Sequence, residues 1–187
     1  MGETLEQHEH AAHAAEGGRK YTALLIAALA AGLAFAEQGA QHADTTMSQN
    51  AIAATDLWAQ YQAKSIRATS SRQLADLAAT MSAPDIAARD ALVARLRADA
   101  TGFEQDPNVG KAAIARQAHG LEAARDAAHQ RLEAFDNAAA ALQLAIVLVT
   151  ASVITGSAVL VWLGGLLGAA GVVVAVLGAI APRLAAF

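Results

Sequence analysis

Two long stretches of the chain contain no ionisable side chain, and they dominate its hydrophobic pattern. Residues 21–36 and 138–181 have no Arg, Lys, Asp, Glu or His. A helix that crosses a bilayer needs about 20 mostly apolar residues. The first stretch reaches that length when it is extended to Ala40. The pattern therefore predicts a transmembrane helix at 21–40, preceded by a polar leader, rich in Glu and His, at 1–20.

A cleaved signal peptide is the rival interpretation of the first apolar stretch. Ala34-Phe35-Ala36 has the small-x-small form of a cleavage site, and Arg19-Lys20 resembles the basic region of a signal peptide. The residues before Arg19 are polar and include four glutamates. An acidic leader is unusual in a signal peptide, so we favour an uncleaved anchor.

The second stretch is too long for one crossing. A helix over 138–181 would rise by about 65 Å, whereas the apolar core of a bilayer is about 30 Å thick. We expect two transmembrane helices, at 138–155 and 158–181, joined by a tight turn. Gly156 is the favoured turn residue because glycine tolerates positive φ.

Small residues recur along one face of the last predicted helix. They are Gly164, Gly168, Gly171, Ala175 and Gly178. Small side chains let helix backbones approach closely in lipid, so the stripe indicates a helix–helix contact within or between protomers. The alternative is that membrane helices are simply rich in Gly and Ala.

The polar segment at 41–137 is also expected to be helical, because alanine dominates it and Gly and Pro are rare. Pro84 and a predicted loop over Thr101–Gly110 divide it into helices at 43–81, 84–100 and 111–137. The first should continue from the first span, and the third should run into the second span. The fold class is therefore all-α: an integral membrane protein with three transmembrane helices and a long extramembrane helical hairpin, similar to a coiled coil, between the first two.

Charge and composition exclude some functions. The net charge is −4 and no basic cluster is present, which argues against nucleic acid as a partner. Because the chain has no cysteine, thiolate chemistry and disulfides are excluded. The apolar cores of the predicted spans hold hydroxyl groups but no ionisable group, which weakens a transporter interpretation. Hydroxyls in helices commonly bond to their own backbone.

Two groups of residues are candidates for chemical sites. His8, His10 and His13 have a spacing that could bind a divalent metal, but we favour a solvated, partly disordered leader and predict no metal site. Glu37, Glu133 and Asp136 lie at the predicted membrane boundary, and His119 and His129 are expected in solvent. No nucleophile or phosphate loop accompanies these carboxylates, so we predict neither an enzyme nor a cofactor.

One run in the polar segment mixes aromatic, amide and basic side chains. It contains Trp58, Tyr61, Gln62, Lys64 and Arg67. Trp58 and Tyr61 lie on the side of the helix that is expected to pack against a neighbouring helix. The whole set is a candidate packing surface or interface. The run at 56–67, DLWAQYQAKSIR, resembles the signature of a bacterial membrane-protein family known only as a domain of unknown function. Gln60 departs from that signature, which is usually aromatic at this position. The resemblance implies membership and no activity.

The flanking charges predict a topology. Arg19 and Lys20 place the N-terminus in the cytoplasm by the positive-inside rule, and the helical domain would then be periplasmic. We expect a non-enzymatic inner-membrane scaffold or accessory subunit, whose partners are the lipid bilayer and either copies of itself or a larger membrane complex. The alternative is a stator-like, ion- or force-coupled assembly, which normally keeps its helical domain in the cytoplasm.

Overall fold

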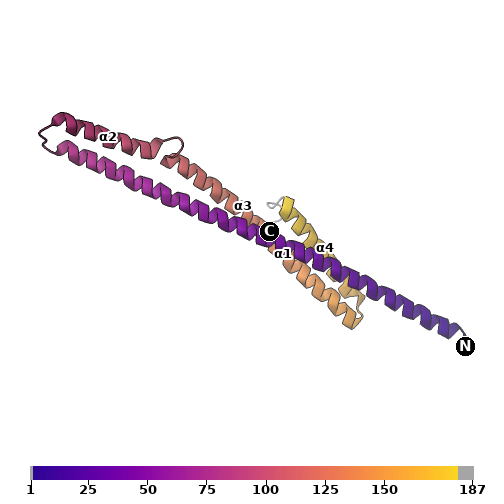
Figure 1. Ribbon diagram of the computed structural model, residues 1–187. Helices are drawn as coiled ribbons and strands as arrows, with labels where there is room; N and C mark the ends of the chain where they lie inside the picture. Colours follow the sequence, from indigo (N-terminus) through magenta and orange to yellow (C-terminus); the bar gives the residue numbers. More distant parts are fainter. Residues whose placement is uncertain (1, 181–187) are drawn as a thin grey trace. The chain divides into compact units, whose positions relative to one another are not determined.

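The computed structural model describes residues 2–180, and their side chains from Lys20 onward. Over these residues the regular secondary structure consists of four helices (Figure 1). They are α1 (Gly2–Thr80), α2 (Ile86–Gln105), α3 (Lys111–Thr155) and α4 (Ala158–Ile180). The chain divides into two compact units: unit 1 combines the chain up to Thr45 with the chain from Ala127 onward, and unit 2 is Thr46–Asp126.

In unit 1, the first part of α1 packs against the second part of α3 and against α4. Leu142 and Val149 of α3 are the largest fully buried side chains in the described part of the chain. The ring of Phe135 meets that of Phe35 edge-on, with the ring centroids 6.3 Å apart. The buried cluster comprises Leu29, Ala36, Ala40, Phe135, Ala138, Ala139, Leu142, Ala145, Val149 and Ala175.

The turn between α3 and α4 confirms the prediction for Gly156. α3 ends at Thr155, α4 begins at Ala158, and Gly156 has φ of +68°. An L side chain rarely adopts this conformation, whereas glycine does so readily. The hydroxyls of α3 also behave as expected: Thr150 donates to the Ile146 carbonyl at 2.7 Å, and Thr155 donates to the Ala151 carbonyl at 3.0 Å.

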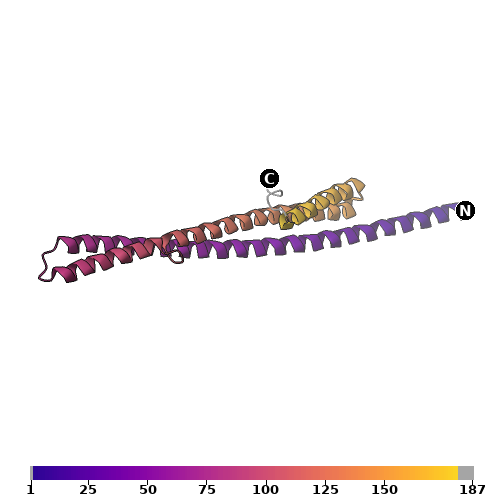
Figure 2. The ribbon, with the colours of Figure 1, turned by 90° about the horizontal axis from the view of Figure 1, so that it is seen from above.

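In unit 2, α2 and then the first part of α3 run back along the second half of α1 (Figure 2). Small side chains fill the space between these helices, as the alanine-rich seam predicts. The buried apolar residues of this unit are Ala54, Ala68, Ala75, Val93, Ala100, Ala113, Ile114 and Ala118. The unit therefore buries little apolar surface for each residue that it orders.

The predicted boundaries of the second polar helix were wrong at both ends. α2 begins at Ile86 because Asp85 is its N-cap, and the Asp85 carboxylate accepts a hydrogen bond of 2.9 Å from the Ala88 N–H. Pro84 thus precedes the cap and is not in the first turn. At the other end, the helix continues to Gln105, and the predicted ten-residue loop shrinks to the turn after it. A glycine such as Gly102 weakens a helix by about 1 kcal/mol and does not have to end it.

The continuity of the other helices agrees with the sequence. α1 runs without a break from the apolar segment into unit 2, and α3 runs through Gly120 to Thr155. α1 also covers most of the leader, for which no helix was predicted, and α4 reaches Ile180, the last residue that the structure describes.

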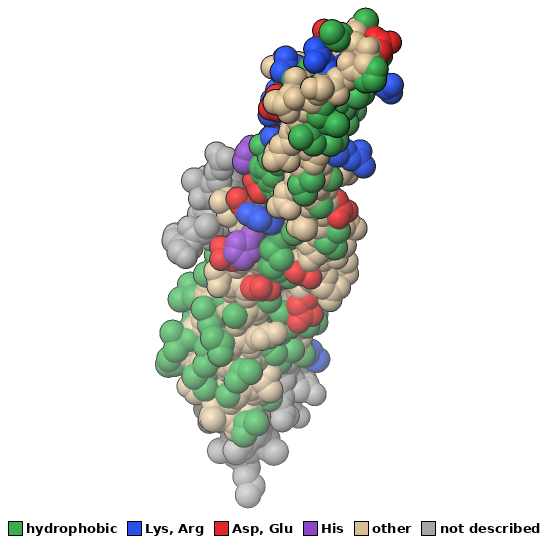
Figure 3. Space-filling model, turned by 90° about the vertical axis from the view of Figure 1, so that its left-hand side faces the viewer, with side chains coloured by type: hydrophobic (Ala, Val, Ile, Leu, Met, Phe, Trp, Pro, Cys, Tyr) green, Lys and Arg blue, Asp and Glu red, His purple; other side chains and the backbone are tan. Residues whose placement is uncertain are grey.

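Three of these helices are long and apolar enough to cross a membrane: Lys20–Thr80 of α1, α3 and α4. The α1 segment has 61 residues, about three times the length of one crossing, so only its apolar part can lie in a bilayer. The face seen in Figure 3 shows the same division of polarity, because hydrophobic side chains cover much of unit 1 whereas basic and acidic side chains gather on unit 2.

Candidate functional site: a polar and aromatic cluster in unit 2

The aromatic and basic run of α1 has two faces. Trp58, Tyr61 and Lys64 are partly buried, whereas Gln62 and Arg67 are exposed. In an α-helix, residues three or four apart share a face, so Trp58, Tyr61 and Ser65 turn together toward α3. Neither Gln62 nor Arg67 makes a hydrogen bond or an ion pair with any described side chain. The structure thus divides the predicted interface residues into an inner group and an outer group.

Trp58 is the centre of the inner group. Its indole N–H donates to Glu122 Oε1 at 2.9 Å, and its ring lies edge-on to the rings of Tyr61 and His119, with centroids 5.5 and 5.2 Å away. His119 Nδ1 lies 2.8 Å from the other carboxylate oxygen of Glu122. The hydrogen bond from Trp58, followed by that from His119, lowers the pKa of Glu122 below its ordinary value. The ionised carboxylate therefore holds an aromatic residue of α1 and a histidine of α3 together.

A second set of contacts lies further along α1, from Tyr61 to Arg72. Lys111, at the start of α3, donates to Ser65 Oγ at 3.1 Å, and its Nζ lies 4.9 Å from the centre of the Tyr61 ring. The same ammonium group lies 3.8 Å from Glu104 Oε1, and Glu104 also pairs with Arg72 of α1. The hydrogen bond from Arg72 is the main cause of the lowered pKa of Glu104. These contacts tie the end of α2 and the start of α3 to α1.

The turn between α2 and α3 is held by Asp106. Its carboxylate accepts hydrogen bonds from the N–H groups of Asn108 at 2.8 Å and Val109 at 3.0 Å. The bond from Val109, then that from Asn108, lowers the pKa of Asp106, and the positive charge of Lys64 adds to this effect. Lys64 therefore acts on the turn through its charge and lies on the inner side of α1.

Sequence reasoning found the α1 half of this cluster and missed the other half. His119 is exposed, as expected of a solvated residue, but it also contacts Trp58 and Glu122. Glu104, Lys111 and Glu122 were not singled out. The spacing of His119 and Glu122 by three residues was the one local signal of a pair on α3. The pairing of either residue with α1 depends on the alignment of two helices, which no local pattern fixes.

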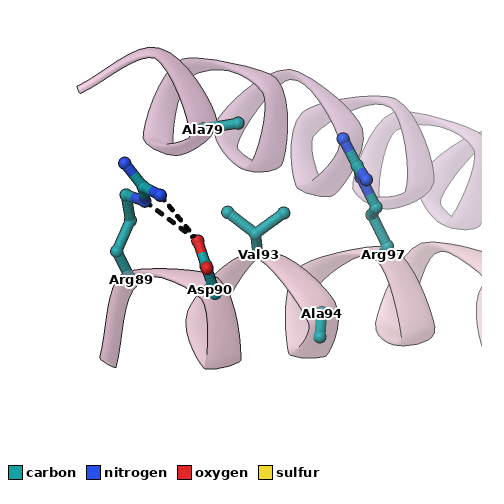
Figure 4. A pocket seen from close by; sticks show the side chains of 6 residues that line it. All are labelled: Ala79, Arg89, Asp90, Val93, Ala94 and Arg97. Atoms are coloured by element: carbon teal, nitrogen blue, oxygen red, sulfur yellow. Dashed lines mark hydrogen bonds and ion pairs between the residues drawn. The ribbon is translucent and has the colours of Figure 1, made fainter. Parts of the chain in front are cut away.

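The hollows on unit 2 are shallow and lie between α2 and the last turns of α1. One of about 370 Å³ is lined by six residues, of which Ala79 belongs to α1 and the rest to α2 (Figure 4). There, Arg89 pairs with its neighbour Asp90 across 2.9 Å, and Arg97 points toward α1. Another hollow, of about 300 Å³, lies between Arg97, Asp76, Arg72 and Thr101. These are surface ion pairs, of the kind that contributes little to stability.

The boundary carboxylates and the leader histidines complete the sequence candidates. Glu37, Glu133 and Asp136 are exposed in unit 1, and Glu133 lies 3.4 Å from His129, one helical turn earlier. His8, His10 and His13 lie outside the side chains that the structure describes. Among the described side chains, no group of three or more His, Asp or Glu is placed to hold a metal ion.

The small-residue stripe of α4 is buried in unit 1. A side chain at Gly164 would place its Cβ 2.6 Å from Val149 and 2.9 Å from the Ala145 carbonyl, both on α3. At Gly178 the corresponding Cβ would lie 2.8 Å from Ala134. The buried residues of α4 are Gly164, Gly168, Gly171, Ala175 and Gly178, the same five that the sequence singles out. In the structure, the close approach that this stripe permits is made inside the chain.

Fold and site together define an all-helical protein with three helices able to cross a membrane and a polar hairpin unit held by side-chain contacts. The chain belongs to the family described as "Domain of unknown function (DUF4337)", which it matches over residues 18–181. This confirms the membership that the sequence resemblance implied. No curated protein and no solved structure matches the chain.

Proposed function

We propose that the protein is a non-enzymatic scaffold or accessory subunit of a bacterial inner membrane. It spans the bilayer three times, and it acts by associating with copies of itself or by joining a larger membrane complex. The three apolar segments, in α1, α3 and α4, support the three crossings because each is long enough for one.

The observation that carries the proposal is the inverted distribution of side chains in unit 2. Its inner positions are mostly alanines, whereas its larger apolar side chains point outward. The exposed large apolar residues of this unit are Ile52, Ile66, Leu74, Leu77, Met81, Ile86, Leu92 and Val109. Burial stabilises by about 25 cal/mol per Å² of apolar surface, so alanines contribute little and the outer residues could contribute much. A second chain that covers them would supply this missing burial.

The packing of unit 1 also favours unit 2 as the place where chains contact each other. The five small residues of α4 are already covered by α3 and α1 of the same chain, so they are not a free surface for another protomer. Association through close helix packing in the membrane would need a different face. Unit 2 is therefore the favoured place for contacts between chains.

The proposed topology has the N-terminus in the cytoplasm and unit 2 in the periplasm. It rests on Arg19 and Lys20 before the first apolar segment. The chain has no cysteine, so a single Ala98→Cys substitution, at an exposed position of α2, gives one labelling site in unit 2. A membrane-impermeant maleimide should label this site in spheroplasts. Labelling only after lysis would place unit 2 in the cytoplasm and would favour the stator-like alternative.

Native mass spectrometry of the protein, extracted from its own membrane into lipid nanodiscs, tests the proposed role. We expect either a closed homo-oligomer or a complex of fixed stoichiometry with other membrane proteins. A protein that leaves the membrane only as a monomer, with nothing bound at fixed ratio, would contradict the proposal.

A further inference from the structure

The outer side of α1 in unit 2 carries a continuous uncharged stripe. We define the α1 outer stripe as Ala59, Ala63, Ile66, Ser70, Leu74 and Leu77, all of which are exposed. At about 100° per residue, these six residues lie within about 80° of one another around the helix axis. The stripe is opposite the seam formed by Tyr61, Ser65 and Ala68. It therefore faces away from α2 and α3.

The large side chains of the stripe are each more than half exposed. Ile66 is 66% exposed, Leu74 53% and Leu77 59%. Ser70 stands between Ile66 and Leu74 at intervals of four, and Ala63 precedes Ile66 by three. Large and small side chains together at intervals of three and four form a helix face that can pack against another helix.

The charges of the unit are placed so that they avoid this stripe. Lys64 lies on the side of Asp106, Arg72 pairs with Glu104, and Asp76 pairs with Arg97 across 3.5 Å. These contacts turn Lys64, Arg72 and Asp76 toward α2 and the turn after it, whereas Arg67 lies at the edge of the stripe. Asp56 lies on the continuation of the stripe toward the N-terminus and marks its end there.

A neutral stripe suits a second copy of the same chain. Copies in one bilayer share their orientation, so a two-fold axis between them runs along the membrane normal, and each residue of the interface lies near its own counterpart. Like charges would then meet on any charged face, such as the outer side of α2 around the exposed Arg95. The α1 outer stripe brings together only alanine, serine, isoleucine and leucine.

The two exposed residues of the aromatic and basic run, Gln62 and Arg67, flank this stripe. Gln62 lies on one side of it and Arg67 on the other, five positions later. In a parallel pair of helices, residues with this separation on opposite flanks lie across the interface from each other. Gln62 of one copy can therefore accept a hydrogen bond, through its amide oxygen, from Arg67 of the second copy, and no like charge is brought close.

We propose that the α1 outer stripe binds the same stripe of a second copy of this chain, in parallel, with Gln62 and Arg67 at its edges. This inference rests on the proposed role in assembly. It adds which surface of the chain binds and what binds to it. The occupant is a second copy because the stripe is neutral and matches itself about a two-fold axis. It also supplies the apolar burial that unit 2 lacks.

Single cysteines test the proposal in the full chain in its native membrane. Ser70→Cys lies at the centre of the stripe and should form a disulfide-linked dimer when mild oxidant is added. Thr69→Cys is the matched control, since it is exposed on the same helix but is turned by about 100°. Ala98→Cys, exposed on α2, is the second control. We expect several-fold more dimer from Ser70→Cys than from either control, and equal yields would overturn the proposal.

A photoactivatable benzophenone attached to the same Ser70→Cys site identifies the occupant. An adduct with twice the mass of the chain supports a second copy. An adduct with another protein, or with lipid alone, overturns that assignment.

A variant in the stripe separates this inference from the proposed function. Ile66→Asn with Leu77→Asn should weaken the dimer at least about tenfold in nanodiscs, since two apolar side chains per copy lose their burial. Leu92→Asn, exposed on α2, is the control and should leave the dimer unchanged. Because these side chains are exposed, the folded chain should keep its helical circular dichroism. A homo-oligomer that survives the double variant with unchanged affinity would reject the stripe and leave the proposed function standing, whereas a wild-type monomer without partners would reject both.

Discussion

Trp58 donates its indole N–H to Glu122 Oε1 across 2.9 Å, although 64 positions of sequence separate the two residues. The contact joins α1 to α3, and His119 completes it from the neighbouring turn of α3. In a unit whose interior is mostly alanine, such polar and aromatic contacts have an additional role. They fix which residues of the two helices lie opposite each other, since a seam of uniform small side chains could slide with little cost.

The Glu122 carboxylate makes the stability of unit 2 depend on pH. Its pKa is lowered in the folded chain below the ordinary value of 4.5, mainly by the bond from Trp58. A lowered pKa gives stability that is complete above the unfolded value and is lost as pH falls through the folded value. We therefore expect the contribution of Glu122 to the melting temperature to be constant near neutral pH. The melting temperature should decrease at pH values under about 4.5.

The measurement is thermal unfolding of the detergent-solubilised protein between neutral and acidic pH. Glu104 and Asp106 also have lowered pKa values and titrate in the same range. The comparison is therefore between wild type and Trp58→Phe, which keeps a ring but loses the N–H donor. The variant should be slightly less stable at neutral pH, and the difference should shrink in acid. A difference that grows as the pH falls would contradict the assigned direction.

The N-cap of α2 gives a second prediction. Asp85 accepts a hydrogen bond from the Ala88 N–H, and loss of such a cap costs about 1 kcal/mol. Asp85→Ala should lower the free energy of unfolding by this amount, and Asp85→Asn should restore most of it because asparagine also caps helices. Asp90→Ala is the control, since Asp90 pairs only with its neighbour Arg89. Hydrogen exchange should show the loss in the first turn of α2. Equal effects of Asp85→Ala and Asp85→Asn would argue against a capping role.

The cap also shows what could be read from the sequence and what could not. Pro84 and Asp85 together predict a helix start, but they do not decide which of the two is in the first turn. Gly156 was predictable because a single glycine stands between two apolar runs, and no other residue there tolerates positive φ easily. The end of α2 was missed because Thr101 and Gly102 read as a loop. In the structure, Thr101 donates its hydroxyl to the Arg97 carbonyl at 2.9 Å and continues the helix.

The candidate site was predictable only on one of its helices. Trp58 and Tyr61 stand out as large aromatic residues in an alanine-rich seam. Glu122 has no such local mark, because its role depends on the length of α2 and on the turn at Asp106 that returns the chain. These set the alignment of α3 with α1, and a change of one residue would place a different side chain opposite Trp58.

Phe135 and Phe35 give a matched pair of aromatic residues in unit 1. Their rings touch edge-on, but Phe135 is 6% exposed and Phe35 is 57% exposed. Removal of a buried aromatic ring costs about 3 kcal/mol or more, since a cavity is left behind. Phe135→Ala should therefore destabilise the protein by about that amount, and Phe35→Ala by clearly less. Denaturation in mixed micelles compares the two, and similar losses would show that Phe35 is covered by something other than this chain.

The small-residue stripe of α4 gives the sharpest comparison, because two adjacent glycines have opposite surroundings. A Cβ at Gly164 would lie 2.6 Å from Val149 and 2.9 Å from the Ala145 carbonyl, whereas a Cβ at Gly165 meets nothing within 4 Å. Gly164→Ala should lower stability by about 1 to 3 kcal/mol, the usual cost of overpacking. Gly165→Ala should be neutral or slightly stabilising, because alanine favours the helix more than glycine does. Thermal unfolding of both variants in one detergent provides the measurement. If the two substitutions had equal effects, α4 would not pack against α3 through the face that contains Gly164, and the helical hairpin that the Gly156 turn creates would have to close through another face.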